Sequence, residues 1–134
     1  MKIDIAVYPT SDQIEALIAS KEEGPVVMLN LLRFKPEADE RNGGLTGKEA
    51  YQRYAAKMIP FVTSKGGRLI WAGSVDGHVV GKGGEIFEMA ALVEYPSRKA
   101  FIEIATDPYV EENIGLDRAS GLEGQWLIAC TSGF

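Results

Sequence analysis

The sequence predicts an α+β fold, in which a four-stranded antiparallel sheet carries its helices on one face. The chain of 134 residues is 46% hydrophobic, which is enough to bury one sizeable core. Residues 25–34 form a near-continuous apolar run rich in Val and Leu, typical of a central strand buried on both faces. Helical and alternating patterns follow it in the order helix, strand, strand, helix, strand. We therefore expect one domain over 1–134, with a core at 25–130 and an N-terminal extension at 1–24.

The N-terminal extension is predicted to be a short extended segment followed by a helix. Weak alternation of apolar residues predicts a strand or extended arm over 3–8. A helix is predicted over 11–23, with Thr10 or Ser11 as its N-cap. Its apolar stripe has helical spacing and consists of Ile14, Leu17 and Ile18. Gly24 ends this helix before the central strand begins.

A second helix is predicted after the polar, glycine-containing stretch 36–45, which we expect to be mobile, either as a lid or as a solvated connection. Thr46 and Glu49 form a capping box at its start. The apolar residues that follow recur at helical spacing, at Ala50, Tyr51, Tyr54, Ala55, Met58, Ile59 and Val62. Pro60 removes one intrahelical bond and should kink the second half, and Gly66-Gly67 ends the helix.

The remaining elements alternate between strands and helices. Period-two patterns predict strands at 68–75, 86–95 and 123–130. Helical patterns predict a segment at 97–105 and a second one that restarts at Asp107-Pro108 and closes at Gly121.

From residue 25 onward this element order is the split βαβ, ferredoxin-like plan, with both helices on one face of the sheet. We expect the other face, assigned to Met28, Asn30 and Leu32 with the apolar sides of the other strands, to remain uncovered. An apolar sheet face must be buried against something. We therefore expect a homodimer whose two sheets close into a dimeric α+β barrel around a cavity.

Composition excludes several classes of partner. The formal net charge is −5 and the pI about 4.9, with Lys and Arg scattered, so we expect neither nucleic acid nor an anionic membrane surface as a partner. No window is long and apolar enough to span a membrane, and the N-terminus lacks the apolar region of a secretory signal. A single cysteine, Cys130, suits a reducing compartment, so a cytoplasmic location is expected.

No metal or cofactor is expected. One His and one Cys, far apart in sequence, give no metal-ligand spacing, and no calcium-loop pattern is present. Haem would need His78 as its axial ligand, at a glycine-flanked strand end that would hold it poorly. The glycine-rich stretch 81–84 lacks the spacing of a phosphate-binding loop.

Several short motifs carry a family resemblance. They are the central strand, the pair Tyr51 and Tyr54 with Pro60, Gly66-Gly67-Arg68, Val93 to Ser97, and Asp107-Pro108-Tyr109 with Arg118. In this order they resemble the DUF1330 group of dimeric α+β barrel proteins, over roughly residues 25–130. The resemblance implies a ferredoxin-like protomer, a barrel dimer and a family of unknown function. The wider superfamily includes cofactor-free monooxygenases, lactone isomerases and haem-handling enzymes.

The polar residues near the central strand are the candidate site. Asn30 could fix a carbonyl or enolate of a ligand, or could satisfy neighbouring backbone or a second Asn30 across the dimer. Arg33 could hold a substrate carboxylate, or could pair with Glu88 or Glu94 at the strand end.

Other side chains could line the same cavity. Tyr54 and Trp71 would flank the ligand, although core packing is the alternative for both. Glu88 would act alone, because Glu94 is too far along the strand to pair with it. His78 titrates near neutrality and could move a proton, or could be a surface residue. Arg118 matches the family's arginine in the last helix, where it would tie that helix to a loop or to the partner subunit.

Two functional hypotheses follow. In the first, the protein binds a small, mostly apolar compound with a carboxylate, keto or hydroxy group, and acts as a cofactor-free oxygenase or isomerase by analogy with the superfamily. In the second, it is a non-catalytic binding or assembly module whose barrel is filled by its own side chains. A cavity that reaches Asn30 would favour the first hypothesis.

Overall fold

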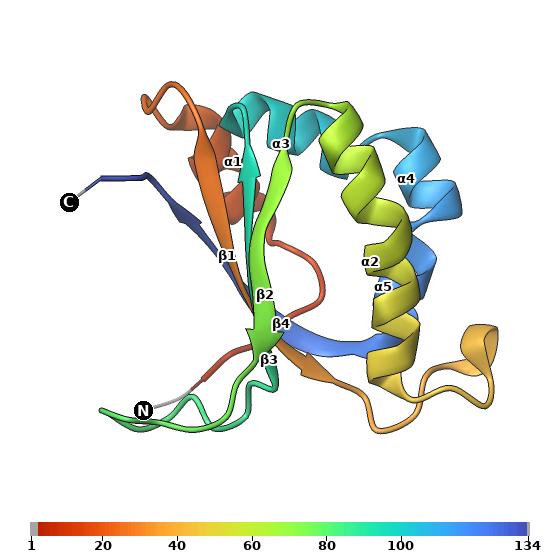
Figure 1. Ribbon diagram of the computed structural model, residues 1–134. Coiled ribbons are helices and arrows are strands. Elements are labelled where there is room, and N and C mark those ends of the chain that lie inside the picture. The colour runs from red at the N-terminus through yellow and green to blue at the C-terminus, as the bar shows by residue number, and fades with distance from the viewer. Residues whose placement is uncertain (1–2, 134) are drawn as a thin grey trace.

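The computed structural model describes residues 3–133 and has the predicted α+β architecture. Four strands form one antiparallel sheet in the order β2-β3-β1-β4, the order of the ferredoxin-like plan. The strands are β1 (Val26–Phe34), β2 (Arg68–Ser74), β3 (Met89–Tyr95) and β4 (Leu122–Cys130). The helices are α1 (Ser11–Ala19), α2 (Gly47–Ser64), α3 (Arg98–Ala105), α4 (Pro108–Asn113) and α5 (Gly115–Gly121), with a 3₁₀ turn η1 (Glu40–Asn42). Helices α2, α4 and α5 lie together on one side of the sheet (Figure 1).

Thr10 and Thr46, which are predicted N-caps of the first two helices, cap these helices in the structure. The Thr10 side chain accepts a hydrogen bond from the backbone of Gln13, and the Gln13 side chain returns one to the backbone of Thr10. Thr46 and Glu49 make the same reciprocal pair at the start of α2. Each pair satisfies two backbone N–H groups that the first helical turn leaves free, which fixes where the helix begins.

The predicted boundaries differ from the structure in four places. The first helix, expected over 11–23, ends at Ala19, since residues 20–23 are polar and add nothing to its apolar stripe. The arm expected over 3–8 pairs with the sheet through a single bridge, between Ala6 and Gln125. The helical pattern over 107–121 is divided into α4 and α5, because the backbone of Ile114 leaves helical geometry between them. The strand expected to start at residue 86 begins at Met89, since the backbone of Phe87 is used in a turn with Gly84. None of the helices within residues 3–133 is long and apolar enough to cross a membrane.

The hydrophobic core lies between the sheet and the helices and consists of two clusters. The larger cluster contains residues of β1, β3 and the helices: Val26, Met28, Met58, Val62, Val93, Tyr95, Ile104, Val110 and Ile114. The smaller one contains Leu32, Phe34, Tyr51 and Leu122. Met28 belongs to the first cluster and Leu32 to the second. The boundary between the clusters therefore crosses this face of β1 at Asn30.

We expected Met28, Asn30 and Leu32 to lie on the uncovered face of the sheet, and this prediction is wrong. These side chains point toward the helices, where Met28 and Leu32 are buried, and are not on the uncovered face. Both faces of β1 are apolar, so the period of two cannot distinguish them, and a shift by one residue exchanges the faces. The uncovered face carries the alternate residues, and we name it the open face: Leu29, Leu31, Trp71, Leu92, Trp126 and Ile128.

A bulge in β2 places Trp71 on the face opposite to the one expected from its spacing to Leu69. Leu69 lies opposite Val93 on the helix side, but the register shifts before Trp71, which lies opposite Leu92 on the open face. The inserted residue, Ile70, reverses the alternation. Trp71 is therefore on the opposite face of the sheet from Tyr54 and cannot flank a ligand together with it.

Candidate functional site

A group of polar side chains lies at the boundary between the two core clusters. We call it the polar layer and define it as Asn30, Tyr51, Tyr54, Arg118 and Gln125. Asn30 sits at the middle of β1 on the helix side and is partly buried, with its Nδ2 donating to the Met28 carbonyl at 3.2 Å. Among the described residues, nothing bonds to its Oδ1. A half-satisfied amide in an apolar layer is a group that a ligand or water can complete.

The two tyrosines reach the polar layer from α2. They are three residues apart on one helical face, and their ring centroids are 5.2 Å apart. Tyr54 packs against both core clusters, so it lies at the same boundary as Asn30. None of the described residues forms a hydrogen bond with either hydroxyl group. Buried tyrosine hydroxyls usually have partners, so these two are available to an oxygen-bearing ligand.

The electrostatics of the tyrosines keep them protonated. Burial is the largest cause that raises the pKa of Tyr51 and of Tyr54, and the coupling between the two phenols raises that of Tyr51 further. The Arg118 guanidinium opposes this rise in pKa at both residues. Helices α2 and α5 are in close contact here, since a Cβ added to Gly121 would lie 2.9 Å from the Tyr51 backbone nitrogen. At neutral pH the phenols are therefore hydrogen-bond donors and not bases.

Arg118 brings a positive charge to the layer from α5. Its Nη2 donates to the Val7 carbonyl at 2.7 Å, and its Cζ lies 5.9 Å from the centre of the Tyr8 ring. No carboxylate within residues 3–133 pairs with it. A partly buried arginine without a carboxylate partner is a ready anchor for an anionic ligand.

The sheet beneath the polar layer has small side chains and accessible edges. Asn30 pairs with Ala91, which pairs with Ala72, so two alanines occupy its row on the helix side of the sheet. On the other side of Asn30, Leu127 of β4 is 40% exposed. Gln125, opposite Leu32, has a buried Oε1 without a hydrogen-bond partner among the described residues. Solvent thus reaches the margins of this layer while its polar groups remain incompletely bonded.

These groups together can bind and polarise an oxygen anion. The layer contains one guanidinium, two protonated phenols and two amides, and no carboxylate or imidazole. Such a set fits a carboxylate, a ketone or an enolate, because each presents oxygen lone pairs to the donors. No group of three His, Cys, Asp or Glu side chains within residues 3–133 could hold a metal ion.

Arg33 and Glu88 are engaged in the ends of the strands. Arg33 donates through Nε to Glu123 and through Nη1 to the Ile86 carbonyl at 3.0 Å. Because it is three residues from Asn30 on one strand, it lies on the opposite face, so the two cannot hold one ligand as expected. Glu88 accepts a hydrogen bond from the backbone N–H of Phe34 at 2.7 Å, which extends the β1–β3 pairing.

His78 lies in the loop between β2 and β3, away from the polar layer. Its Nε2 accepts a hydrogen bond from the Gly84 N–H at 3.0 Å and is 3.7 Å from a Glu85 oxygen. The loop encloses a surface cavity of about 180 Å³ lined by Val75, Asp76, Gly77, His78, Gly84, Glu85 and Phe87. Among the predicted site residues, Asn30 lies on the helix side of β1 at the boundary between the clusters, Tyr54 packs against both clusters, and Arg118 lies on α5. Arg33, Trp71, His78 and Glu88 lie elsewhere.

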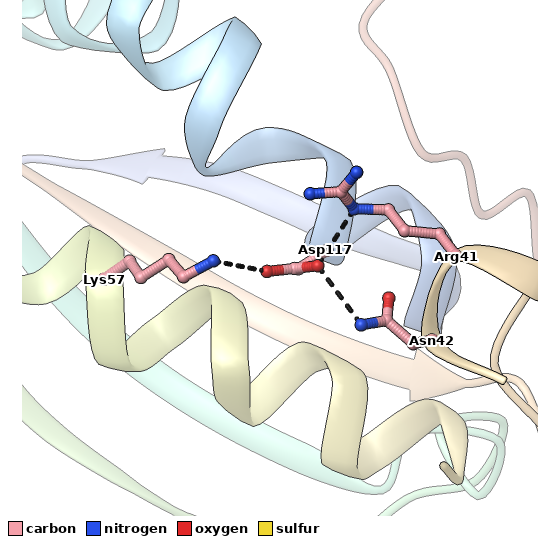
Figure 2. A network of polar contacts seen from close by, with 4 residues as sticks. All are labelled: Arg41, Asn42, Lys57 and Asp117. Atoms are coloured by element: carbon pink, nitrogen blue, oxygen red, sulfur yellow. Dashed lines mark hydrogen bonds and ion pairs between the residues drawn. The ribbon is translucent and has the colours of Figure 1, made fainter. Parts of the chain in front are cut away.

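A second polar network had no signal in the sequence (Figure 2). The buried Asp117 carboxylate accepts hydrogen bonds from Lys57 Nζ at 2.9 Å, Arg41 Nε at 3.1 Å and Asn42 Nδ2 at 3.3 Å. Burial alone would raise the pKa of Asp117, but the three donors together hold that pKa below its ordinary value. Arg41 and Asn42 belong to the 36–45 stretch, which is thus fixed to α2 and α5 instead of being a mobile lid.

Two crystal structures of the RPA0582 protein are similar to this chain over nearly its full length. The methylated RPA0582 protein is 31% identical, and the match covers 98% of this chain and 98% of that chain with a TM-score of 0.86. The RPA0582 protein of unknown function from Rhodopseudomonas palustris is 30% identical, over 98% of this chain and 99% of that chain, with a TM-score of 0.86. The match is long enough to include the N-terminal unit as well as the ferredoxin-like core.

A more remote likeness and two negative results complete the comparison. A DABB family protein with a ferredoxin-like fold from Mesorhizobium loti is 9% identical over 84% of this chain and 100% of that chain, with a TM-score of 0.47. No protein-family model matches the chain, and no curated protein matches it. The resemblance to the DUF1330 group therefore stays a prediction from the residues.

Proposed function

Because the chain belongs to the same family as the RPA0582 protein of Rhodopseudomonas palustris, we propose that both share one role, the binding of a small apolar compound through a carboxylate or keto group. We place this compound in the polar layer, between the sheet and the helices of one protomer. The expected site between the sheets of two protomers does not fit Asn30, because this residue faces the helices of its own protomer.

One observation carries this proposal: Arg118 has no carboxylate partner among the described residues, although it lies on α5, which packs closely against α2 beside Tyr51. A partly buried guanidinium is normally paired, since an isolated charge in an apolar setting is costly. An anionic ligand would supply the missing charge. The phenols of Tyr51 and Tyr54 and the amide of Asn30 would then donate to its remaining oxygens.

The protomer is proposed to act as a homodimer through its open face. Helices α2, α4 and α5 lie on the other side of the sheet (Figure 1), and α1 packs beside α3 through Leu17 on the helix-side core. The extension covers only the β4 margin of the open face, where Trp126 contacts Asp4 and Gly124 lies against Ile5. The centre of the face is apolar, and two ion pairs lie at its opposite ends, Arg68 with Glu94 and Arg33 with Glu123. An apolar centre with a polar rim is the composition of a protein–protein interface.

If the protein is an enzyme, the donor set favours chemistry that passes through an enolate. Protonated phenols, an amide and a guanidinium stabilise developing negative charge on oxygen. Cofactor-free oxygenases and isomerases need such stabilisation, and the layer supplies it without a metal ligand. None of these groups is a proton acceptor, so the layer could stabilise an enolate that is already formed and would not itself remove the proton.

Isothermal titration calorimetry with benzoate tests the binding proposal. Benzoate is a small apolar carboxylate, and benzamide is its neutral counterpart of nearly the same shape. We expect the protein to bind benzoate and to bind benzamide at least about tenfold more weakly, because hydrogen bonds to charged groups contribute about 1.5–3 kcal/mol.

Two variants locate the site. Arg118→Gln should abolish the preference for benzoate, and Asn30→Leu should weaken binding of both compounds. Arg33→Gln is the control, because Arg33 is also a partly exposed arginine but lies on the opposite face of the sheet and is already paired with Glu123. Loss of benzoate binding in Arg33→Gln with retention in Arg118→Gln would reject the polar layer as the site. Failure of the wild-type protein to bind any small carboxylate or keto acid would favour the non-catalytic module.

A further inference from the structure

We propose that the N-terminal arm, residues 3–9, is a working part of the polar layer, in which Val7 and Tyr8 position Arg118 for an anionic ligand. The effect of the arm on ligand binding rests on the proposed function. The contact between the arm and Arg118 does not depend on that function and can be tested separately.

The arm is fixed to β4 before it reaches Arg118. The backbones of Ala6 and Gln125 exchange two hydrogen bonds, at 3.3 and 3.0 Å. Trp126 Nε1 donates to the Asp4 carbonyl at 2.8 Å. A Cβ added to Gly124 would lie 2.7 Å from Ile5, so the absence of a side chain there lets the arm lie close to the strand. These contacts set the position at which the chain leaves the sheet.

The next two residues hold the guanidinium of Arg118 from two directions. The Val7 carbonyl accepts from Nη2 at 2.7 Å, and the Tyr8 ring lies under Cζ at 5.9 Å. In Figure 1 the red segment that follows the sheet-bound part of the arm passes from the sheet toward the helices. A hydrogen bond to one guanidinium nitrogen and a cation–π contact with an aromatic ring together restrict both the translation and the rotation of the group.

The arm leaves most of the guanidinium donors unused. A guanidinium has five N–H groups, and one donor nitrogen is bonded to Val7. The others are without a partner among the described residues, so a carboxylate can still be bound by two parallel hydrogen bonds. Fixing a long side chain before binding removes an ordering cost from the binding step, which corresponds to an affinity difference of about three- to tenfold. The arm therefore acts by preorganisation, and Tyr8 and Val7 are positioning residues.

The experiment uses the full-length chain and three variants. Tyr8→Ala removes the ring, Tyr8→Phe keeps the ring without the hydroxyl, and Tyr109→Ala is the matched control. Tyr109 is 56% exposed against 68% for Tyr8, and its ring is also stacked, on Phe61. The first readout is the NMR order parameter of the Arg118 Nε–H, and the second is the affinity for benzoate and for benzamide by calorimetry.

We expect the Arg118 order parameter to fall in Tyr8→Ala and to remain unchanged in Tyr8→Phe and Tyr109→Ala. Benzoate affinity should fall about three- to tenfold in Tyr8→Ala alone, with benzamide affinity unchanged. An unchanged Arg118 order parameter in Tyr8→Ala would overturn the inference, whether or not benzoate binds. A lower order parameter together with no benzoate binding by the wild-type protein would support the arm's hold on Arg118 and reject the proposed function instead.

Discussion

Lys57 donates a hydrogen bond from Nζ to Oδ2 of Asp117 over 2.9 Å, which ties the middle of α2 to α5. Asp117 is only 3% exposed, whereas the side chains of Lys57 and Arg41 are about half exposed. The carboxylate is thus the buried centre of a network whose cations reach in from the surface (Figure 2). Its position beside Arg118 on α5 connects the stability of this region to the geometry of the polar layer.

Replacing Asp117 by Asn should destabilise the protein and free the 36–45 stretch. The variant loses two charge-assisted bonds, and solvent screening of the half-exposed cations limits the cost to about 1–3 kcal/mol. Urea unfolding measures this change, and amide hydrogen exchange should show faster exchange at Asn42 and Leu45, whose N–H groups bond within the stretch. Lys99→Gln is the control, because its pair with Glu103 is exposed and lies on α3. Equal stabilities of the two variants would argue against the network.

The same residue predicts a loss of stability in acid. The pKa of Asp117 is lowered in the folded state, so the unfolded state binds a proton more readily. The stabilisation is therefore complete above the ordinary aspartate pKa of about 3.9 and is lost as the pH falls through the lower folded value. The difference in urea midpoint between the wild-type protein and Asp117→Asn should be constant from pH 7 to 5 and shrink below pH 4. A difference that grew in acid would contradict the assignment.

A methyl group at Gly47 should be strongly destabilising. A Cβ there would lie 2.1 Å from the Lys35 carbonyl oxygen and 2.6 Å from that of Gly121, both of them backbone atoms. The start of α2 would have to move away from β1 and α5, at a cost of about 3 kcal/mol. Gly77→Ala is the control, since nothing lies within 4 Å of a Cβ at that loop position. Thermal unfolding of the two variants should differ by several degrees, and equal melting temperatures would disprove the close contact.

A charge in the centre of the open face should separate the proposed dimer. Ile128 lies opposite Leu29 on this face and is 42% exposed in the protomer. In a face-to-face dimer, Ile128→Lys would bury an unpaired ammonium group, which the interface cannot accommodate. Light scattering after size exclusion should give a dimer for the wild-type protein and a folded monomer for the variant. Ile18→Lys, at an exposed position on α1, should remain dimeric. A wild-type monomer at micromolar concentration would reject the dimer.

The sequence predicted the elements better than the faces on which their side chains lie. Capping boxes and periodicity are local signals, so the starts of α1 and α2 followed from them, while the element order predicted the ferredoxin-like sheet. The orientation of β1 did not, because Leu29 and Leu31 on one face are as apolar as Met28 and Leu32 on the other. The bulge at Ile70, which turns Trp71 to the open face, is likewise set by pairing with β3 and not by local sequence.

The site was predicted in part for the same reason. Asn30, Tyr54 and Arg118 were identified as polar groups within apolar patterns, and the fold brings their elements to one layer. The contribution of Tyr8 and Val7 could not be anticipated, since more than one hundred residues of chain separate them from Arg118. The Asp117 network joins Arg41 and Lys57 in the same way, through contacts between distant parts of the chain.

The position of the ligand is the central claim, and a benzoate titration followed by ¹⁵N–¹H correlation spectra tests it most directly. The side-chain N–H signals of Arg118 and Asn30 report on the polar layer, and the indole N–H of Trp71 reports on the open face. We predict that the Arg118 and Asn30 signals shift with saturation while the Trp71 signal stays in place. A shift of Trp71 with unmoved Arg118 and Asn30 signals would place the ligand on the opposite side of the sheet and contradict the account.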